Sequence, residues 1–314
     1  MHASIIVCTY NRAESLEHTL TCLAALQSPD GADWEVIVVD NNSNDQTRQV
    51  VKEFSSVFPR LRYEYEQQQG LSYARNHGIK SAKGDILLFT DDDVCPEPDW
   101  LETIMTSMSR YACDACGGFI APTWEVPPPS WLTERFHGFL AIKMDTSDAY
   151  QVTTVKDAPF GANMAFRSTV FDRVGEFDTS RGRKGAELAS GEDGEMFERM
   201  LAAGMKIMYL PDAKVHHRVE AFRATKKYLR RWRYQTSLNL AQSRGLSGNR
   251  HLMGIPLYVF PQLIRALKNA IVTRFTGPED EAFNREMIVW HFLGMMRGLY
   301  RTRNRRRDSS NKLT

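Results

Sequence analysis

The sequence has no apolar stretch long enough to cross a lipid bilayer. Its two most apolar runs, residues 254–264 and 287–296, fall far short of the roughly 20 residues that a transmembrane helix needs. It also has little excess of charge, since 40 basic and 38 acidic residues leave a formal net charge of +2. An even balance of this kind gives no support to nucleic-acid binding as the general function. We expect a globular protein that neither spans a membrane nor binds nucleic acid.

Cysteine is scarce, and the five cysteines are an odd number spread over 314 residues. Without an N-terminal signal sequence, this usage favours a reducing compartment, the cytoplasm, and free thiols throughout. Cys113 and Cys116 have C-x-x-C spacing, but no second pair of this kind completes a zinc site. We interpret both as small apolar residues that enter a buried strand.

Glycine is missing from the turn between the first expected strand and helix, which reads Cys-Thr-Tyr-Asn-Arg-Ala over residues 8–13. A nicotinamide-binding site needs glycines there so that backbone amides can approach the pyrophosphate. The sequence therefore argues against a nicotinamide-dependent oxidoreductase, even though such enzymes share the pattern described next.

The first ninety residues alternate strand and helix, and 42% hydrophobic content can supply a large core. This βαβαβαβ order predicts an α/β fold, a Rossmann-like and mainly parallel sheet with flanking helices. The expected strands are 4–8, 34–39, 61–65 and 86–90, with helices at 11–27 (Asn11 as N-cap), from about 45 and after Gly70. Further along, strands are expected at 117–121, 163–166 and 206–210 (ending before Pro211), helices at 96–110 and 195–203, and a loop at 181–194.

The amino-acid composition changes near residue 220, which predicts two regions. Residues 1–220 form the expected α/β domain, whereas residues 221–314 are helical, basic and aromatic. Arginine crowds the end of the second region, at positions 297, 301, 303, 305, 306 and 307.

Three consecutive aspartates, Asp91, Asp92 and Asp93, directly follow the apolar fourth strand. Like charges at one place raise each other's pKa unless a cation neutralises them. Oxygen ligands suit Mg²⁺ or Mn²⁺, and such a metal keeps open positions for a diphosphate. Ligands of parallel sheets bind beyond the carboxyl ends of the strands, where Asp40 also falls. The alternative is a solvated acidic turn.

Five short motifs in order resemble the family 2 inverting glycosyltransferases of the GT-A fold, over about residues 3–220. No single motif is specific, but five in register are. The final ninety residues match less specifically. The motifs are Thr9-Tyr10-Asn11-Arg12, Val39-Asp40-Asn41, Ala74-Arg75-Asn76, Asp91-Asp92-Asp93 and Gly191-Glu192-Asp193.

The resemblance implies a nucleoside-diphosphate sugar as donor, UDP-sugar by family habit, with Mn²⁺ or Mg²⁺ as cofactor. Asp40 would accept the N3 hydrogen of uracil, and Thr9, Tyr10 and Arg12 would belong to the donor site. Arg75 would meet the diphosphate. Asp91 and Asp92 would contact ribose or metal, Asp93 would be the main metal ligand, and His216, or its neighbour His217, would complete the metal site.

The resemblance also implies that Asp193 is the base that removes the acceptor hydroxyl's proton, while Glu192 orients the acceptor. Each residue has a plainer reading: Asp40 as a turn residue, Arg75 as a solvated helix residue, Glu192 and Asp193 as complements of a helix dipole, and the histidine as an ordinary polar residue. The expected acceptor is a glycan or a lipid-linked sugar. The letters of residues 230–235 stand in the wrong order for the Q-x-x-R-W motif of processive members, which favours a single transfer.

Two other functions remain open. The stretch 88–94 superficially matches the signature of aspartate-nucleophile phosphatases, although it closes the fourth strand instead of the first. A non-catalytic sugar-nucleotide-binding or membrane scaffold protein would keep the fold and lose the base or the aspartates, and this chain has both.

The C-terminal region is expected to hold the protein on the cytoplasmic membrane face as a peripheral protein. Apolar residues from Leu257 to Val272 lie at near-helical spacing, beside Arg265, Lys268 and Arg274. Residues 287–300 add a second apolar stretch, followed by the arginine-rich tail. The alternative is that both stretches pack on the catalytic domain or form a dimer interface.

Overall fold

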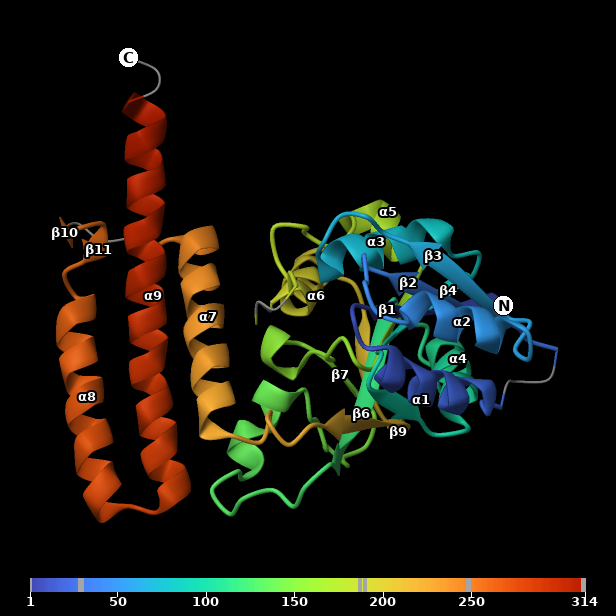
Figure 1. Ribbon diagram of the computed structural model, residues 1–314, viewed down its shortest axis with the longest axis horizontal. Coiled ribbons are helices and arrows are strands. Elements are labelled where there is room, and N and C mark those ends of the chain that lie inside the picture. The colour runs from blue at the N-terminus through green and yellow to red at the C-terminus, as the bar shows by residue number, and fades with distance from the viewer. Residues whose placement is uncertain (1, 28–30, 186–187, 189–190, 247–249, 312–314) are drawn as a thin grey trace. The chain divides into compact units, whose positions relative to one another are not determined.

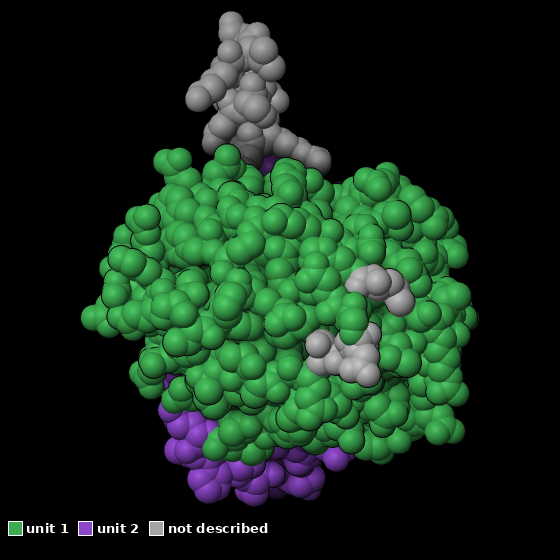
Figure 2. All heavy atoms as spheres, turned by 90° about the vertical axis from the view of Figure 1, so that its right-hand side faces the viewer, with its two compact units in different colours: residues 1–124, 140–186, 190–219 green, residues 125–139, 187–189, 220–314 purple. Residues whose placement is uncertain are grey.

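The computed structural model describes residues 2–27, 31–185, 188, 191–246 and 250–311, with side chains as far as residue 302 except that of Arg244. The chain forms two compact units (Figure 2). The sheet unit comprises residues 1–124, 140–186 and 190–219, and the helical unit comprises residues 125–139, 187–189 and 220–314.

Four parallel strands form one half of the main sheet, as the sequence predicts (Figure 1). They are β1 (His2–Thr9), β2 (Asp33–Asp40), β3 (Leu61–Tyr65) and β4 (Ile86–Asp91), in the spatial order β3-β2-β1-β4. Thr9 pairs with Asp40, and Cys8 pairs with Asp91. The polar residues that end these strands therefore meet at one edge of the sheet.

Helices cover both faces of the sheet, which is why the strands are apolar on both sides. Ile5 and Val7 face α1 (Ala13–Ala24), α2 (Thr47–Ser55) and α4 (Trp100–Arg110). Ile6 faces the opposite layer of α3 (Leu71–Ser81), α5 (Thr169–Val174) and α6 (Glu192–Ala202). The unit is a three-layer α/β/α structure.

The other half of the sheet is mixed. β8 (Met164–Arg167) runs antiparallel between β4 and β6 (Ala115–Trp124), and β9 (Ile207–Val219) runs parallel to β6. The short strands β5 (Val94–Pro96) and β7 (Tyr150–Gln151) pair with β9, and 3₁₀ turns span Glu134–Leu140 and Val155–Asp157.

The predicted end of a strand before Pro211 is wrong, because β9 continues to Val219. The pairing with β6 shifts its register between Gly118 and Phe119, so that residues 211–213 bulge out of the ladder and Pro211 needs no partner for its missing N–H. The histidines at 216 and 217 consequently lie within a strand and pair with β5.

Three predicted helix boundaries also differ. Asn11 is not an N-cap: it has φ 51°, and α1 begins only at Ala13. The predicted helix from residue 96 begins at Trp100, because residues 94–96 join the sheet. α6 begins at Glu192, three residues before the predicted start, so Glu192 and Asp193 lie in its first turn.

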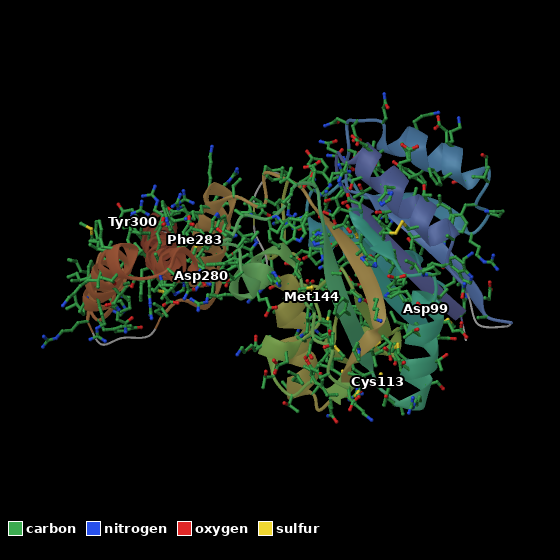
Figure 3. All side chains as sticks on the ribbon, turned by 90° about the horizontal axis from the view of Figure 1, so that it is seen from below. Asp99, Cys113, Met144, Asp280, Phe283 and Tyr300 are labelled. Atoms are coloured by element: carbon green, nitrogen blue, oxygen red, sulfur yellow. A yellow bond between two sulfur atoms is a disulfide. The ribbon has the colours of Figure 1, made fainter. Side chains whose placement is uncertain are left out.

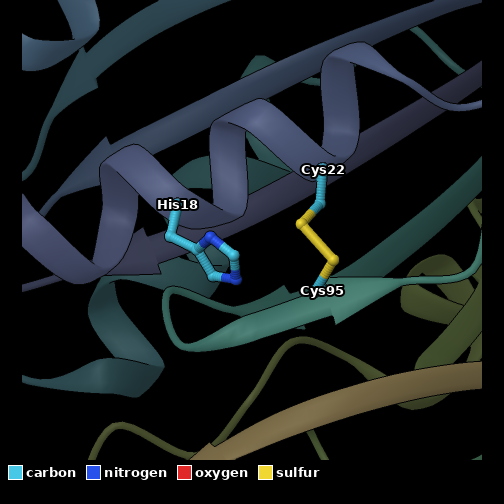
Figure 4. Close-up of side chains that lie close together, drawn as sticks. All are labelled: His18, Cys22 and Cys95. Carbon is cyan, nitrogen blue, oxygen red and sulfur yellow. A yellow bond between two sulfur atoms is a disulfide. The ribbon is translucent and has the colours of Figure 1, made fainter.

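The expectation of free thiols is wrong for two of the five cysteines. Cys22 on α1 and Cys95 on β5 form a disulfide across 73 residues of sequence, beside His18 (Figure 4). Spacing could not reveal this pair, because only the fold brings α1 over β5. Cys8, Cys113 and Cys116 are free, and the last two are buried as predicted.

The helical unit is built around α9 (Glu279–Asn311), against which α7 (Lys226–Arg244) and α8 (Val259–Thr276) both pack (Figure 1). Gly294 and Gly298 let α7 approach closely, since a Cβ at either position would fall on the backbone of α7 at Tyr234 or Leu238. Trp131 and Phe136 come from the segment 125–139 and pack on Phe283 of α9, the residue labelled in Figure 3. A short ribbon of β10 (His251–Leu252) and β11 (Ile255–Pro256) precedes α8.

Within the described part of the chain, no helix combines the length and apolar character that a membrane span requires. This agrees with the prediction from the short apolar runs.

Candidate active site at the carboxyl edge of the sheet

The aspartate cluster is held by the turn between β1 and α1. The hydroxyl of Thr9 donates to Asp92 Oδ2 at 2.7 Å. The guanidinium of Arg12 bridges two carboxylates, with Nε 3.3 Å from Asp92 Oδ1 and Nη2 3.0 Å from Asp93 Oδ2. The Thr-Tyr-Asn-Arg motif thus contacts the aspartates directly. Tyr10, the residue that follows Thr9, is half-buried.

Hydrogen bonds to the loop after β2 fix the backbone of this turn. The amide of Asn11 donates to the Ser43 hydroxyl at 2.9 Å, and the Asn11 side chain accepts from the amide of Asn44 at 2.7 Å. The amide of Ala13 donates to Asp45 at 3.0 Å. These contacts support the left-handed conformation of Asn11, which asparagine tolerates better than most residues.

His217, and not His216, lies against the aspartates. Its Nε2 is 3.3 Å from Asp93 Oδ1, and its side chain is buried. The ring of His216 is half-exposed and faces Glu97 at 2.5 Å. Neighbouring residues of a strand point to opposite faces of the sheet, so only one of the two can join the cluster. The sequence left this choice open, with His216 named first.

The electrostatics of the cluster fit a divalent cation. Burial, followed by the charge of Asp93, raises the pKa of Asp91 above its ordinary value. Burial also raises the pKa of Asp92 to about 7, although Arg12 and the Thr9 hydrogen bond oppose the shift. Carboxylate and imidazole are ligand types suited to Mn²⁺ or Mg²⁺, and a cation bound here would oppose the upward pKa shifts of Asp91 and Asp92.

Asp40 lies at the end of β2 with its carboxylate buried. Its Oδ1 accepts from the amide of Ser43 at 2.9 Å, and its Oδ2 accepts from the Tyr63 hydroxyl at 2.8 Å. The turn interpretation of Asp40 is therefore correct for one oxygen. It leaves each oxygen a second lone pair for a ligand, because a carboxylate oxygen accepts two hydrogen bonds.

Arg75 is buried among carboxylates and is not a solvated helix residue. Its Nη1 lies 3.2 Å from Glu192 Oε1 and 2.5 Å from Asp193 Oδ1. The other Asp193 oxygen accepts from the amide of Gly161 at 2.8 Å, and a Cβ at Gly161 would fall on the Arg75 guanidinium. Each oxygen of the Asp193 carboxylate therefore has a partner, Arg75 for one and the Gly161 amide for the other. Asp193 still keeps 21% of its side chain exposed to an incoming group.

These charges perturb one another. Burial, and then the neighbouring Asp193, raises the pKa of Glu192 to about 7. Burial disfavours the charge of Arg75, yet Asp193 and Glu192 outweigh that effect and raise its pKa above the ordinary value. Arg75 lowers the pKa of Asp91 and Asp193 raises it, so the aspartate cluster and the α6 carboxylates lie within electrostatic reach of each other.

The remaining asparagines of the motifs hold loops in place. Asn76 exchanges two hydrogen bonds of 2.9 Å with the backbone of Phe177, whose ring lies 5.2 Å from the Arg75 guanidinium. Asn41 donates to the backbone of Gln68 at 2.7 Å and accepts from the amide of Gly70 at 2.7 Å. Both therefore shape the walls of the site.

Comparison with known proteins identifies the family. Residues 4–175 match the family model described as glycosyl transferase family 2. The chain belongs to this family. The resemblance predicted from the five motifs is confirmed.

Relatives of this glycosyltransferase act in glycolipid and polysaccharide synthesis. It is 29% identical over 228 residues to the glucosyl-dolichyl phosphate glucuronosyltransferase of Haloferax volcanii, covering 71% of each chain. It is 30% identical over 241 residues to the succinoglycan biosynthesis protein ExoM of Rhizobium meliloti, covering 75% of this chain and 73% of that protein.

The fold matches a solved structure along nearly its whole length. The mannosyltransferase PcManGT from Pyrobaculum calidifontis, in complex with GDP-Man and Mn²⁺, superposes with a TM-score of 0.62 at 18% identity. The match covers 95% of this chain and 87% of that one. At this identity the likeness establishes the fold, which is the predicted GT-A type with added C-terminal helices.

Sequence reasoning missed several residues of the candidate site. Tyr63 on Asp40 and Gly161 on Asp193 belong to no motif, and nothing in their local sequence marks them. Arg12 stood in a motif, but its position on two aspartates was not foreseen. The choice of His217 could have been predicted if the strand had been extended past Pro211. Neighbouring residues of a strand point to opposite faces, so only one of the two histidines could face the aspartates.

Proposed function

We propose that this glycosyltransferase catalyses single, inverting transfers of a sugar from a UDP-sugar to an acceptor hydroxyl. The observation that carries the proposal is the arrangement around Arg75: it pairs with Asp193 and Glu192, and its charge acts on Asp91 of the aspartate cluster. A base and a diphosphate site within reach of each other are what direct displacement at an anomeric carbon requires.

The donor site in this proposal lies at the edge where β1, β2 and β4 end. Asp40 accepts the N3 hydrogen of uracil through a free lone pair, while Tyr63 and Ser43 hold its carboxylate in place. Thr9 and Tyr10 line the base pocket. Asp92 is fixed by Thr9 and Arg12 and is directed to the ribose or metal.

Asp93, Asp91 and His217 are proposed to hold Mn²⁺ or Mg²⁺. When bound, the metal neutralises the charge that develops on the leaving diphosphate. Imidazole and carboxylate together suit Mn²⁺ well. His217 takes the position first assigned to His216, because its ring is the one that faces Asp93.

Asp193 is proposed as the catalytic base. Its 2.5 Å contact with Arg75 and the 2.8 Å hydrogen bond from the Gly161 amide hold the carboxylate in one orientation. It can then take the acceptor proton as the acceptor oxygen attacks from the face opposite the diphosphate. In this proposal the role of Arg75 is to orient the Asp193 carboxylate, which it contacts directly. Glu192, buried beside it, orients the acceptor.

The proposed acceptor is a glycan or a lipid-linked sugar at a membrane, as the names of the two relatives suggest for those proteins. The helical unit supports a peripheral position on the cytoplasmic membrane face. α8 carries three basic residues, Arg265, Lys268 and Arg274, and no acidic residue. Its apolar side chains Ile264, Ile271 and Phe275 are 67%, 59% and 83% exposed.

The second apolar stretch has a different role. Met287, Val289 and Leu299 of α9 are buried among α7 and α8, so this part forms the core of the helical unit. A cavity of about 950 Å³, lined by apolar, basic and acidic residues of the three helices, opens beside Phe275. Membrane binding is thus proposed for α8 alone. The side chains of the arginine tail from residue 303 onward lie outside the described part.

The decisive experiment separates donor binding from transfer. UDP binding should require Mn²⁺ in calorimetric titrations, and Asp93→Ala should abolish that metal-dependent binding. Asp193→Asn should bind UDP like the parent protein but lose at least 100-fold in turnover, because an amide cannot accept the proton. Glu198→Gln, which removes an exposed carboxylate from the same helix, is the matched control.

Turnover is measured with the nucleotide-sugar that best stabilises the protein in a thermal-shift screen. The anomeric configuration of the product is read by NMR. An α-linked donor should give a β-linked product, and retention would refute direct displacement. A protein that binds UDP and Mn²⁺ but transfers no sugar to any glycan or lipid-linked acceptor would support the non-catalytic alternative instead.

A further inference from the structure

We propose that Arg12 is a placeholder cation: its guanidinium occupies the aspartate cluster until the divalent metal arrives, then leaves Asp93 and binds the donor's diphosphate. This inference rests on the proposed metal and donor site. It assigns Arg12 a role in ordering the two binding events, metal first and nucleotide second.

The position of the guanidinium carries the first step. Arg12 Nη2 lies 3.0 Å from Asp93 Oδ2, and Nε lies 3.3 Å from Asp92 Oδ1. The side chains of the two aspartates are 4% and 8% exposed, whereas that of Arg12 is 25% exposed. Arg12 is therefore the most exposed of the three side chains, although the Nη2 atom nearest Asp93 is itself buried.

Competition between the two cations follows from the shared carboxylate. The other oxygen of Asp93 faces His217 Nε2 at 3.3 Å, so a metal held by Asp93 and His217 would have the guanidinium as a close neighbour. Two cations in a buried site repel each other strongly because little water separates them. Asp92 still retains its Thr9 hydrogen bond if Arg12 withdraws.

The backbone around Arg12 allows the side chain to move while the turn stays in place. Asn11 and Ala13, on either side, are tied to Ser43 and Asp45 through their amides. Arg12 is the residue that precedes the first turn of α1. A long side chain on a fixed anchor beside a helix N-terminus is well suited to reach phosphate oxygens, and guanidinium binds these in a bidentate manner.

The test compares Arg12→Gln, Arg12→Lys and the parent protein in two titrations. The first measures Mn²⁺ binding alone, by the electron paramagnetic resonance signal of free Mn²⁺. The second measures UDP binding at saturating Mn²⁺, by calorimetry. Arg60→Gln is the matched control, since it removes the same charge from an exposed residue of the sheet unit whose guanidinium lies over Trp34.

Arg12→Gln should bind Mn²⁺ alone about tenfold more tightly than the parent protein and bind UDP about tenfold more weakly. Arg12→Lys should keep much of the competing charge, so its Mn²⁺ affinity should stay near the parent value, and Arg60→Gln should change neither affinity. Unchanged or weaker Mn²⁺ binding by Arg12→Gln would overturn the inference, because that result is expected if Arg12 only holds Asp92 and Asp93 in place. A parent protein that binds no Mn²⁺ would overturn the proposed metal site itself, and the inference with it.

Discussion

At the scale of single residues, side chains that neutralise one another decide the properties of the site. The motifs predicted which residues gather at the sheet edge, because parallel strands bring their carboxyl ends together. They did not predict the pairings. Arg75 is a helix residue whose sequence neighbours give no sign of burial, and only the approach of α6 makes it the partner of Asp193. Such contacts join residues more than 100 positions apart, beyond the reach of local patterns.

Glu192 offers a test of this charge arrangement through the pH dependence of stability. Its pKa is raised to about 7 in the folded protein, above the ordinary value of 4.5. An acid with a raised pKa binds protons more readily in the folded state, so its contribution to stability is lost as the pH rises from about 4.5 to 7. Glu192→Gln should therefore raise the free energy of unfolding at pH 8 by about 1 to 3 kcal/mol.

The gain should vanish near pH 4.5, where Glu192 is largely protonated in the folded parent protein. Urea unfolding at both pH values measures it, with Glu198→Gln as the exposed control on the same helix. Equal effects of Glu192→Gln at pH 4.5 and pH 8 would mean that Glu192 has an ordinary pKa.

At the scale of elements, the sequence predicted the types and the order well and the ends less well. Strongly apolar strands such as β1 and β4 were placed within two residues, because their burial on both faces leaves a clear pattern. β5 was missed, since three residues carry no detectable period. The missed strand changes the site, because β5 directly follows Asp93 and aligns with the end of β9 that carries His217.

The disulfide between Cys22 and Cys95 ties α1 to β5, and its reduction should destabilise the sheet unit. Closing a loop of 73 residues removes conformational entropy from the unfolded chain, worth up to about 4 kcal/mol in the chain-entropy model. Dithiothreitol should therefore lower the melting temperature of the parent protein. Cys22→Ala should melt at the lower temperature with or without the reductant. A parent protein indifferent to dithiothreitol in this comparison would show that the bond contributes nothing to stability.

At the scale of the whole molecule, the proposed catalytic residues lie in the sheet unit, while α8 of the helical unit exposes large apolar side chains. The sequence predicted this surface from the spacing of apolar residues on α8, but it could not tell that stretch from the one on α9. Both have helical apolar faces. The difference is tertiary: Gly294 and Gly298 let α7 pack closely on α9, whereas Ile264 and Phe275 of α8 remain 67% and 83% exposed in the described part of the chain.

Anionic liposomes should therefore recruit the protein through α8. Each basic residue near an anionic surface contributes about 1 kcal/mol, and a large apolar side chain that becomes fully buried contributes about 1.5–3 kcal/mol. Ile271→Glu and Phe275→Glu should each reduce co-flotation with anionic vesicles at least tenfold at low salt, and high salt should weaken binding of the parent protein. Val57→Glu replaces an equally exposed apolar residue of the sheet unit and should float like the parent. A parent protein that stays in the soluble fraction at low salt would remove the membrane proposal and leave the acceptor open. Equal flotation of all four proteins would place the membrane contact elsewhere than on α8.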